Sequence, residues 1–120
     1  MAKRDRRGAE RRGRRAEWIA VWWLRLKGYN ILSLRFKSPA GEIDIIARKG
    51  ATLAFIEVKQ RAKLSAALQA VPPSAWLRIA RAAELWTGQN NRFQSLDWRF
   101  DLIAIAPGHW PAHKRDYWRP

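Results

Sequence analysis

Cysteine is absent from this chain of 120 residues, and Asp and Glu together contribute only 10 residues. The absence of cysteine excludes disulfides and thiolate metal sites, and nothing in the sequence indicates an oxidising compartment. A membrane-spanning helix needs about 20 apolar residues, whereas the longest apolar run, WIAVWWL, covers only Trp18 to Leu24. The first residues contain neither an apolar core nor a small-residue cleavage site. We therefore expect no signal or transit peptide, no membrane partner and a cytoplasmic location.

The shortage of acidic residues leaves a large excess of positive charge. Lys and Arg number 24, which gives a formal net charge of +14 and an isoelectric point of about 11.5. In a chain of single-domain size, this imbalance favours nucleic acid as a partner over a merely soluble basic surface. Residues 1–13 are expected to form a flexible basic arm that contacts phosphates through Arg4, Arg6, Arg7, Arg11 and Arg12.

The rest of the chain is predicted to form a domain over residues 14–106 and an irregular, basic and aromatic tail over residues 107–120. The pattern predicts a first helix from about Arg14 to Lys27 that is apolar almost all round and therefore buried, with Gly28 as its C-terminal cap. Turn signals then separate three strands, expected to form an antiparallel meander, from a second helix and a last strand. These elements are expected at residues 30–36, 42–48, 52–60, 72–86 and 98–107.

The segment FIEVKQ places an acid and a base on one strand. Side chains alternate across a strand, so Glu57 and Lys59 project from one face and the intervening apolar residues pack on the other. If the turn around Lys49 and Gly50 has an even number of residues, Asp44 falls on the face of Glu57. Two carboxylates beside a lysine suit magnesium, which takes few protein carboxylates and keeps waters. A cross-strand salt bridge is the alternative, and spacing alone leaves both open.

Several segments together resemble a known protein family. GEIDIIARKG and LAFIEVKQR, preceded by EWIAVWWLRLKGYNIL and followed by WRFDLIAI, are similar to the YraN-like family of bacterial proteins. That family is itself similar to the Holliday-junction resolvases and restriction endonucleases of the PD-(D/E)xK nuclease superfamily. The resemblance covers residues 13–105. It implies an α/β fold of the restriction-endonuclease-like type, with an αβββαβ core and a mixed central sheet flanked by helices.

The resemblance also implies roles for individual residues. Asp44 and Glu57 match metal ligands, Lys59 completes the ExK motif as a catalytic residue, and Glu17 matches an additional acidic position on the first helix. The implied metal is Mg²⁺, with Mn²⁺ as a substitute. Apart from the resemblance, Glu17 lies at helical spacing from the apolar residues that follow it, so its side chain can face the sheet. A first-turn glutamate stabilised by the helix dipole is the alternative interpretation of Glu17.

Further charged residues are candidates for phosphate contact or for structure. Arg61 follows the ExK motif, with a solvated strand-end cation as the alternative. Members of the resembled family often carry lysine where this chain has Ala75, so we assign that contact to Arg78. Asp101 is interpreted as the structural partner of a buried arginine, such as Arg99 or Arg61.

Histidines and tryptophans give weaker signals. His109 and His113 have the spacing of a metal-binding pair on a helix, but Pro111 between them argues against a helix and against a metal site there. Among the eight tryptophans, those of the first helix are expected in the core, and those of the tail are candidates for base stacking, with packing of the tail as the alternative. These are Trp18, Trp22 and Trp23 in the helix, and Trp110 and Trp118 in the tail.

The sequence therefore predicts a magnesium-dependent endonuclease that hydrolyses phosphodiester bonds of DNA, branched DNA included. Two alternatives stay open. One is a nucleic-acid-binding or scaffold protein of the same fold that cuts nothing, and the other is a basic ribosome- or RNA-associated factor. The sequence decides neither between DNA and RNA substrates nor whether two chains pair as a homodimer.

Overall fold

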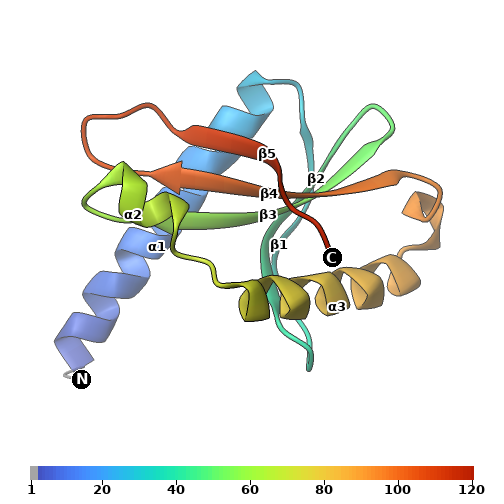
Figure 1. Cartoon of the computed structure of the whole chain (residues 1–120), viewed down its shortest axis with the longest axis horizontal. Coiled ribbons are helices and arrows are strands. Elements are labelled where there is room, and N and C mark those ends of the chain that lie inside the picture. Colours follow the sequence, from blue (N-terminus) through green and yellow to red (C-terminus); the bar gives the residue numbers. More distant parts are fainter. Residues whose placement is uncertain (1–2) are drawn as a thin grey trace.

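The chain folds around one five-stranded sheet with helices on both faces (Figure 1). The computed structural model describes residues 3–120, and their side chains from residue 13 onward. The elements in chain order are α1 (Lys3–Leu26), β1 (Asn30–Lys37), β2 (Glu42–Lys49), β3 (Thr52–Gln60), α2 (Leu64–Leu68), α3 (Pro73–Gln89), the 3₁₀ helix η1 (Asn91–Phe93), β4 (Asp97–Ile105) and β5 (Ala112–Trp118). The α/β fold and the αβββαβ order expected from the sequence are confirmed, with α2, η1 and β5 in addition.

The strands are arranged in the order β1-β2-β3-β4-β5. β1, β2 and β3 form the predicted antiparallel meander. β4 pairs parallel to β3, which requires a long crossover, and α2 and α3 provide it. β5 pairs antiparallel to β4. The sheet is therefore mixed, with β1 and β5 at its two edges.

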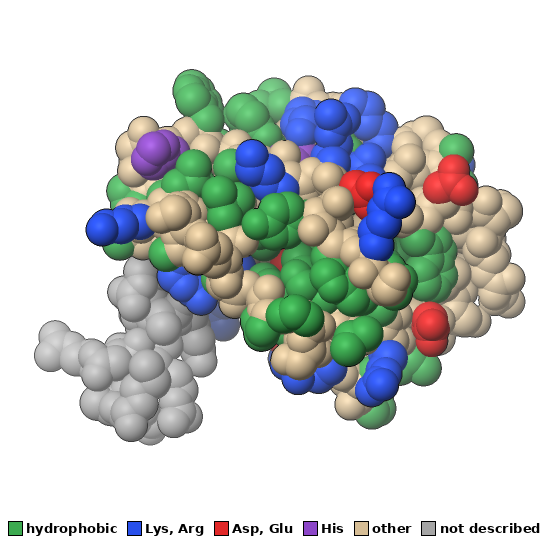
Figure 2. Space-filling model, viewed as in Figure 1, with side chains coloured by type: hydrophobic (Ala, Val, Ile, Leu, Met, Phe, Trp, Pro, Cys, Tyr) green, Lys and Arg blue, Asp and Glu red, His purple; other side chains and the backbone are tan. Residues whose placement is uncertain are grey.

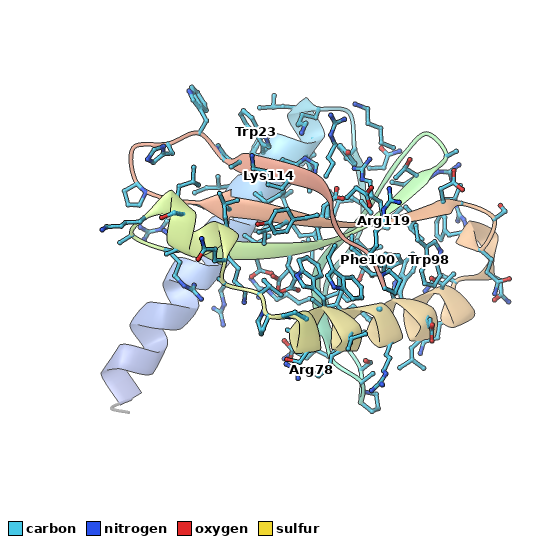
Figure 3. The ribbon with its side chains drawn as sticks, viewed as in Figure 1. Trp23, Arg78, Trp98, Phe100, Lys114 and Arg119 are labelled. Atoms are coloured by element: carbon cyan, nitrogen blue, oxygen red, sulfur yellow. The ribbon has the colours of Figure 1, made fainter. Side chains whose placement is uncertain are left out.

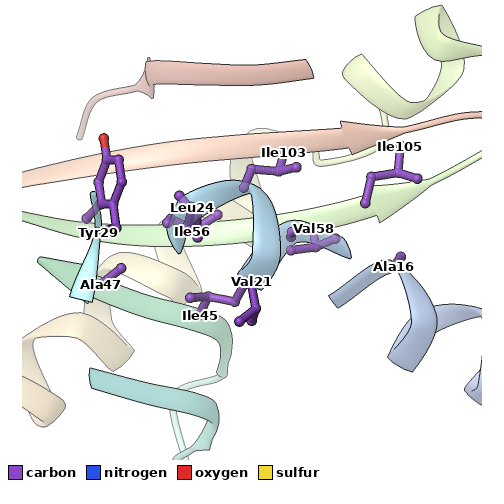
Figure 4. Close-up of a cluster of buried hydrophobic side chains, with 12 residues drawn as sticks. Ala16, Val21, Leu24, Tyr29, Ile45, Ala47, Ile56, Val58, Ile103 and Ile105 are labelled. Atoms are coloured by element: carbon purple, nitrogen blue, oxygen red, sulfur yellow. The ribbon is translucent and has the colours of Figure 1, made fainter. Parts of the chain in front are cut away.

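Two hydrophobic cores lie on the two faces of the sheet. Successive residues of β3 contribute to opposite cores, because Ile56 packs in the core under α1 and Phe55 in the core against α3. Val21 and Leu24 of α1 are buried among the aliphatic side chains of β2, β3 and β4 (Figure 4). This alternation confirms the predicted strand parity of β3.

α1 buries one stripe instead of its whole circumference. Its buried face consists of small and aliphatic side chains, namely Ala16, Ala20, Val21 and Leu24. Trp18 is 54% exposed and Trp22 is 63% exposed, so the prediction that these tryptophans belong to the core is wrong. A helix meets a sheet along one stripe only, and within residues 13–120 no further layer covers the other side. Trp23 stacks on the exposed Trp110, with 5.8 Å between ring centroids.

The bounds of α1 also differ from the prediction. The helix begins at Lys3, earlier than the expected start near Arg14. It ends at Leu26, and Gly28 has the positive φ of 89° expected of a C-terminal cap. No helix among the described residues is long and apolar enough to cross a membrane.

β5 is the largest departure from the expected fold. The prediction of an irregular tail over residues 107–120 is wrong, because Ala112–Trp118 pairs with β4 and places His113 opposite Ile103. The segment HKRDYW shows no alternation of apolar residues, since it is an edge strand with largely exposed side chains. Trp118 stacks on Trp76 of α3 at 5.9 Å between centroids. This tail tryptophan therefore packs against the domain.

Asp101 connects β4 to β5 through a buried network. Its fully buried carboxylate accepts hydrogen bonds from Nε and Nη2 of Arg99 at 2.9 and 2.8 Å, from Nε2 of His113 at 2.8 Å and from the backbone N–H of Asp116 at 2.9 Å. Burial acts to raise the pKa of Asp101, but the bonds from His113 and Arg99 outweigh it and leave the pKa below its ordinary value. The structural interpretation of Asp101 is confirmed, with Arg99 as the arginine.

We predict that Asp101→Asn lowers the free energy of unfolding by about 3 kcal/mol, because it removes the buried carboxylate charge that Arg99 and His113 share. Urea denaturation followed by tryptophan fluorescence measures the change. Asp97→Asn, at the exposed start of the same strand, is the control and should change stability by less than about 0.5 kcal/mol. Equal effects of the two substitutions would show that the network adds nothing specific to stability.

Candidate catalytic site

The candidate site lies where β2 and β3 separate. Their pairing ends at Ile45 and Ile56, and Asp44 and Glu57 are the next residues on the two strands. The pairing begins at Lys49 and Thr52, so the hairpin turn contains an even number of residues, the condition under which Asp44 and Glu57 share a face. Separated strands leave backbone groups without a ladder partner and make room for side chains between them.

Asp44 reaches the backbone of the neighbouring strand. Its Oδ2 accepts a hydrogen bond from the backbone N–H of Val58 at 2.8 Å. The alternation of β2 breaks at this residue, because Ile43 packs in the core against α3 while Ile45 packs in the core under α1. A regular strand would place Ile43 and Ile45 on one face. The break and the hydrogen bond together place the Asp44 carboxylate beside β3.

Burial raises the pKa of both carboxylates. For Glu57, burial is the largest cause and repulsion from Asp44 is the second, and the pKa rises to about 8. For Asp44, burial again dominates, the Val58 hydrogen bond opposes it, repulsion from Glu17 adds to it, and the pKa rises to about 6. Near neutral pH the pair therefore holds a proton, mainly on Glu57.

Lys59 neutralises the pair only in part. Its Nζ lies 3.9 Å from Oε2 of Glu57, and its side chain is 32% exposed. Among residues 13–120, Asp44 has no cation within salt-bridge distance. One partly solvated ammonium thus lies beside one buried and one half-buried carboxylate, and the site carries an excess of negative charge when both are ionised.

Glu17 binds an arginine that the sequence did not single out. Nε of Arg35 donates to both carboxylate oxygens of Glu17, at 3.1 and 3.0 Å. Arg35 lies on β1 between Leu34 and Phe36, whose partners on β2 are the two residues that flank Asp44. Glu17 therefore lies beside the site, and its closest partner is Arg35.

Arg35 has a strained backbone and a free guanidinium end. Its φ is 54°, a left-handed conformation that costs a non-glycine residue about 1 kcal/mol. The side chain is 45% exposed, and within the described part of the chain its two terminal nitrogens have no hydrogen-bond partner. The segment LRF is typical of an ordinary edge strand, and a positive φ at arginine leaves no pattern in the sequence, so no signal could have identified Arg35.

The structure locates two of the other predicted phosphate contacts, Arg61 and Arg78. Arg61 lines a cleft of about 610 Å³ between β3 and the described part of α1, together with Lys59 and Gln60. Arg78 lies on α3 (Figure 3), next to the turn before β2, since a Cβ added at Gly41 would come within 3.2 Å of the Arg78 Cβ. The arginines of the predicted arm, Arg4, Arg6, Arg7, Arg11 and Arg12, lie outside the residues whose side chains are described.

The donor set fits a hard divalent cation with few protein ligands. Within the described residues, no group of three or more His, Cys, Asp or Glu side chains converges as a metal site. Asp44 and Glu57 are the candidate ligands, and Glu17 is held by Arg35. Mg²⁺ is commonly bound through one or two carboxylates, with water and phosphate oxygens in its other positions.

Comparison with known proteins places the chain among bacterial relatives. Residues 16–105 match the model of "Uncharacterised protein family UPF0102", which is the YraN family. A UPF0102 protein of Maricaulis maris is 48% identical over 117 residues, which cover 98% of this chain and 92% of the relative. A UPF0102 protein of Chelativorans sp. is 48% identical over 112 residues, which cover 93% and 90%. The resemblance to the YraN-like family drawn from the sequence motifs is thereby confirmed.

We predict that the stability of the metal-free protein falls as the pH rises from about 5 to 9. The pKa of Glu57 is about 8 in the folded chain against an ordinary value of 4.5. The folded chain therefore keeps a proton that the unfolded chain releases, and this stabilisation is full at low pH and disappears as the pH rises through the folded pKa. Thermal melts in chelator across this range measure the decrease.

Two substitutions test that assignment. Glu57→Gln carries no titrating proton, so it should lack this part of the pH dependence and melt higher than wild type at pH 9. Glu42→Gln, exposed at the start of β2, should follow wild type. Parallel profiles for wild type and Glu57→Gln would mean that Glu57 is already ionised and satisfied at neutral pH.

Proposed function

We propose, since this chain belongs to protein family UPF0102 and its motifs resemble those of PD-(D/E)xK nucleases, that it is a metal-dependent endonuclease acting on DNA, branched DNA included. The supporting observation is the adjacent pair of carboxylates, half-buried Asp44 and buried Glu57, for which Lys59, 3.9 Å from Glu57, is the one cation within salt-bridge distance among residues 13–120. Such a pair destabilises a fold unless a cation joins it. Perturbed carboxylates of this kind cluster at functional sites.

Asp44 and Glu57 are the residues that would hold Mg²⁺ or Mn²⁺. Their oxygen donors and incomplete neutralisation suit a hard cation, and their separation from Glu17 leaves positions for water and substrate. The cation would supply charge that stabilises the phosphoryl group during hydrolysis. The hydrogen bond from Val58 to Oδ2 of Asp44 fixes the orientation of that carboxylate.

Lys59 acts on the attacking water and on the phosphate. Its ammonium group lies 3.9 Å from Oε2 of Glu57, and 32% exposure of the side chain leaves it open to water and substrate. The ammonium orients the water whose oxygen forms the new bond to phosphorus, and it offsets the charge that grows on the phosphoryl oxygens. The attacking water gives up a proton to solvent, the bond between phosphorus and the leaving sugar oxygen breaks, and that oxygen takes a proton from solvent.

Arg35 binds a phosphate group of the substrate. Glu17 engages its Nε, so the two terminal nitrogens form a fork that is already oriented before substrate binds. A guanidinium fork donates two parallel hydrogen bonds to phosphate oxygens. Glu17 thus has a positioning role through Arg35, and Arg61 and Arg78 supply further phosphate contacts on either side.

A non-catalytic nucleic-acid-binding protein is the second candidate. Two of the acidic residues do have cation partners, Glu17 with Arg35 and Glu57 with Lys59, as a purely structural network would require. Asp44 favours the nuclease, because its carboxylate has a backbone hydrogen bond but no cation partner among the described residues.

We predict that the purified protein cleaves nucleic acid in Mg²⁺ or Mn²⁺ and that Asp44→Asn or Lys59→Met lowers the rate by about a hundredfold or more. The assay is a gel-based screen over four-way junctions, flaps, linear duplex and RNA. Glu42→Gln, a neighbouring acid outside the proposed ligand pair, should retain activity. Tight binding without cleavage of any substrate in either metal would favour the non-catalytic candidate.

We predict that Arg35→Gln weakens DNA binding by about tenfold, because the substitution removes a charge-assisted hydrogen bond to phosphate. Fluorescence anisotropy with an Asp44→Asn parent in chelator measures binding separately from cleavage. Glu17→Gln should have a similar but smaller effect by releasing Arg35. Lys37→Gln removes an equal charge from the same strand at an exposed position and serves as the control. If it weakens binding as much as Arg35→Gln does, the fork has no special role.

A further inference from the structure

A group of cations surrounds a buried tyrosine at the opposite end of the sheet. Nζ of Lys49 lies 5.5 Å from the centre of the Tyr29 ring, and Cζ of Arg99 lies 5.9 Å from it. Lys27, directly after α1, lies 2.6 Å from His113 of β5, whose ring is 5.8 Å from that of Tyr29. Arg115, two residues further along β5, completes the group, which we call the Tyr29 cluster. Figure 2 shows Lys and Arg side chains gathered at the upper edge of the molecule, where α1 passes into β1.

The protein neutralises this group with one carboxylate. Asp101 is fully buried, and its oxygens already accept hydrogen bonds from Arg99, His113 and the backbone of Asp116. In residues 13–120, no carboxylate lies within salt-bridge distance of the remaining three cations, Lys27, Lys49 and Arg115.

The cations are held in place by contacts that do not cancel their charge. Nε2 of His113 carries the proton that it donates to Asp101, so Nδ1 of the same ring is an acceptor. It accepts a hydrogen bond from Nζ of Lys27 at 2.6 Å. The side chain of Lys49 crosses Gly28, where an added Cβ would lie 3.7 Å from the Lys49 Cε. Burial lowers the pKa of Lys27, and repulsion from Arg115 and Lys49 lowers it further. The cluster is thus an oriented set of cations with unsatisfied charge.

We propose that the Tyr29 cluster is a phosphate-binding site that holds a phosphodiester group of nucleic acid away from the candidate catalytic site. Two ammonium groups and a guanidinium that lie near one another, with no carboxylate of residues 13–120 within salt-bridge distance, suit an anion with several oxygens. The choice of nucleic acid as the source of that phosphate rests on the proposed function, whereas the anion site itself does not.

The length of β3 makes this a second site. Thr52 pairs with Lys49 at the hairpin end of the strand, and Glu57 lies five residues further along it. At about 3.3 Å per residue the two positions are about 17 Å apart, which corresponds to about five phosphates along one strand of DNA. One phosphate cannot contact both sites, so a bound nucleic acid gains an additional anchor from the cluster.

The first test uses inorganic phosphate as the probe. Phosphate is titrated against chloride of equal ionic strength into the ¹⁵N-labelled Asp44→Asn protein in chelator, and amide shifts are followed by NMR. We expect saturable shifts at Gly28, Lys49 and Arg115. The double substitution Lys49→Gln with Arg115→Gln, at two exposed positions, should weaken phosphate binding by about tenfold or more.

A matched variant controls for net charge. Lys63→Gln with Arg81→Gln removes one lysine and one arginine at exposed positions elsewhere in the domain, and it should leave the phosphate affinity unchanged. Phosphate shifts that spread evenly over the surface, or that fall equally in both double variants, would overturn the site.

The second test identifies the source of the phosphate. Binding of a duplex of about 20 base pairs is measured over a range of salt concentrations in the same Asp44→Asn background. The double substitution in the cluster should reduce the salt slope by about 0.9 for each phosphate that is no longer neutralised, and by more than the control variant does. A cluster that binds inorganic phosphate but leaves the DNA slope equal to that of the control would overturn the assignment to nucleic acid. Cleavage by the wild-type protein decides the proposed nuclease function separately.

Discussion

Burial of β3 on both faces is the constraint on which the rest of the structure depends. Every residue from Leu53 to Val58 is buried, because α1 covers one face and α3 the other. An acidic side chain on such a strand loses most of its hydration, and its ionised form then requires a nearby cation. Glu57 stands on this strand at the point where β2 departs, and Lys59 at 3.9 Å provides only part of that requirement. The raised pKa of Glu57 thus follows from the position of one acid on the central strand.

The two ends of the sheet carry charge imbalances of opposite sign. At the end where β2 and β3 separate, Asp44 and Glu57 exceed the available cations when both are ionised, and at the hairpin end the Tyr29 cluster exceeds its one carboxylate, Asp101. The length of β3 separates the two groups by about 17 Å, well beyond the screening length of about 8 Å at physiological salt. They therefore cannot compensate each other. A metal ion at one end and phosphates at the other would relieve both imbalances.

Local patterns predicted what depends on neighbours along the chain. Strand alternation in FIEVKQ paired Glu57 with Lys59, and the short hairpin brought Asp44 alongside, because both depend on spacing alone. β5 was missed because its pairing depends on the buried charge of Asp101, which bonds a histidine and an amide twelve and fifteen residues away. The exposure of Trp18 and Trp22 depends on how many layers cover α1, and composition alone does not specify that number.

Arg35 shows how the edge of the sheet contributes to its centre. A left-handed residue within a strand costs about 1 kcal/mol, and such strain persists only where surrounding contacts maintain it. Here the contact is the ion pair between Arg35 and Glu17, in which the arginine side chain is partly exposed. An exposed ion pair contributes less than about 1 kcal/mol to stability, so it offsets the strain only in part. The left-handed conformation of Arg35 therefore adds little to the stability of the folded chain. Its consequence is spatial, because it brings a guanidinium with free terminal nitrogens from β1 to the border of a site whose acids come from α1, β2 and β3.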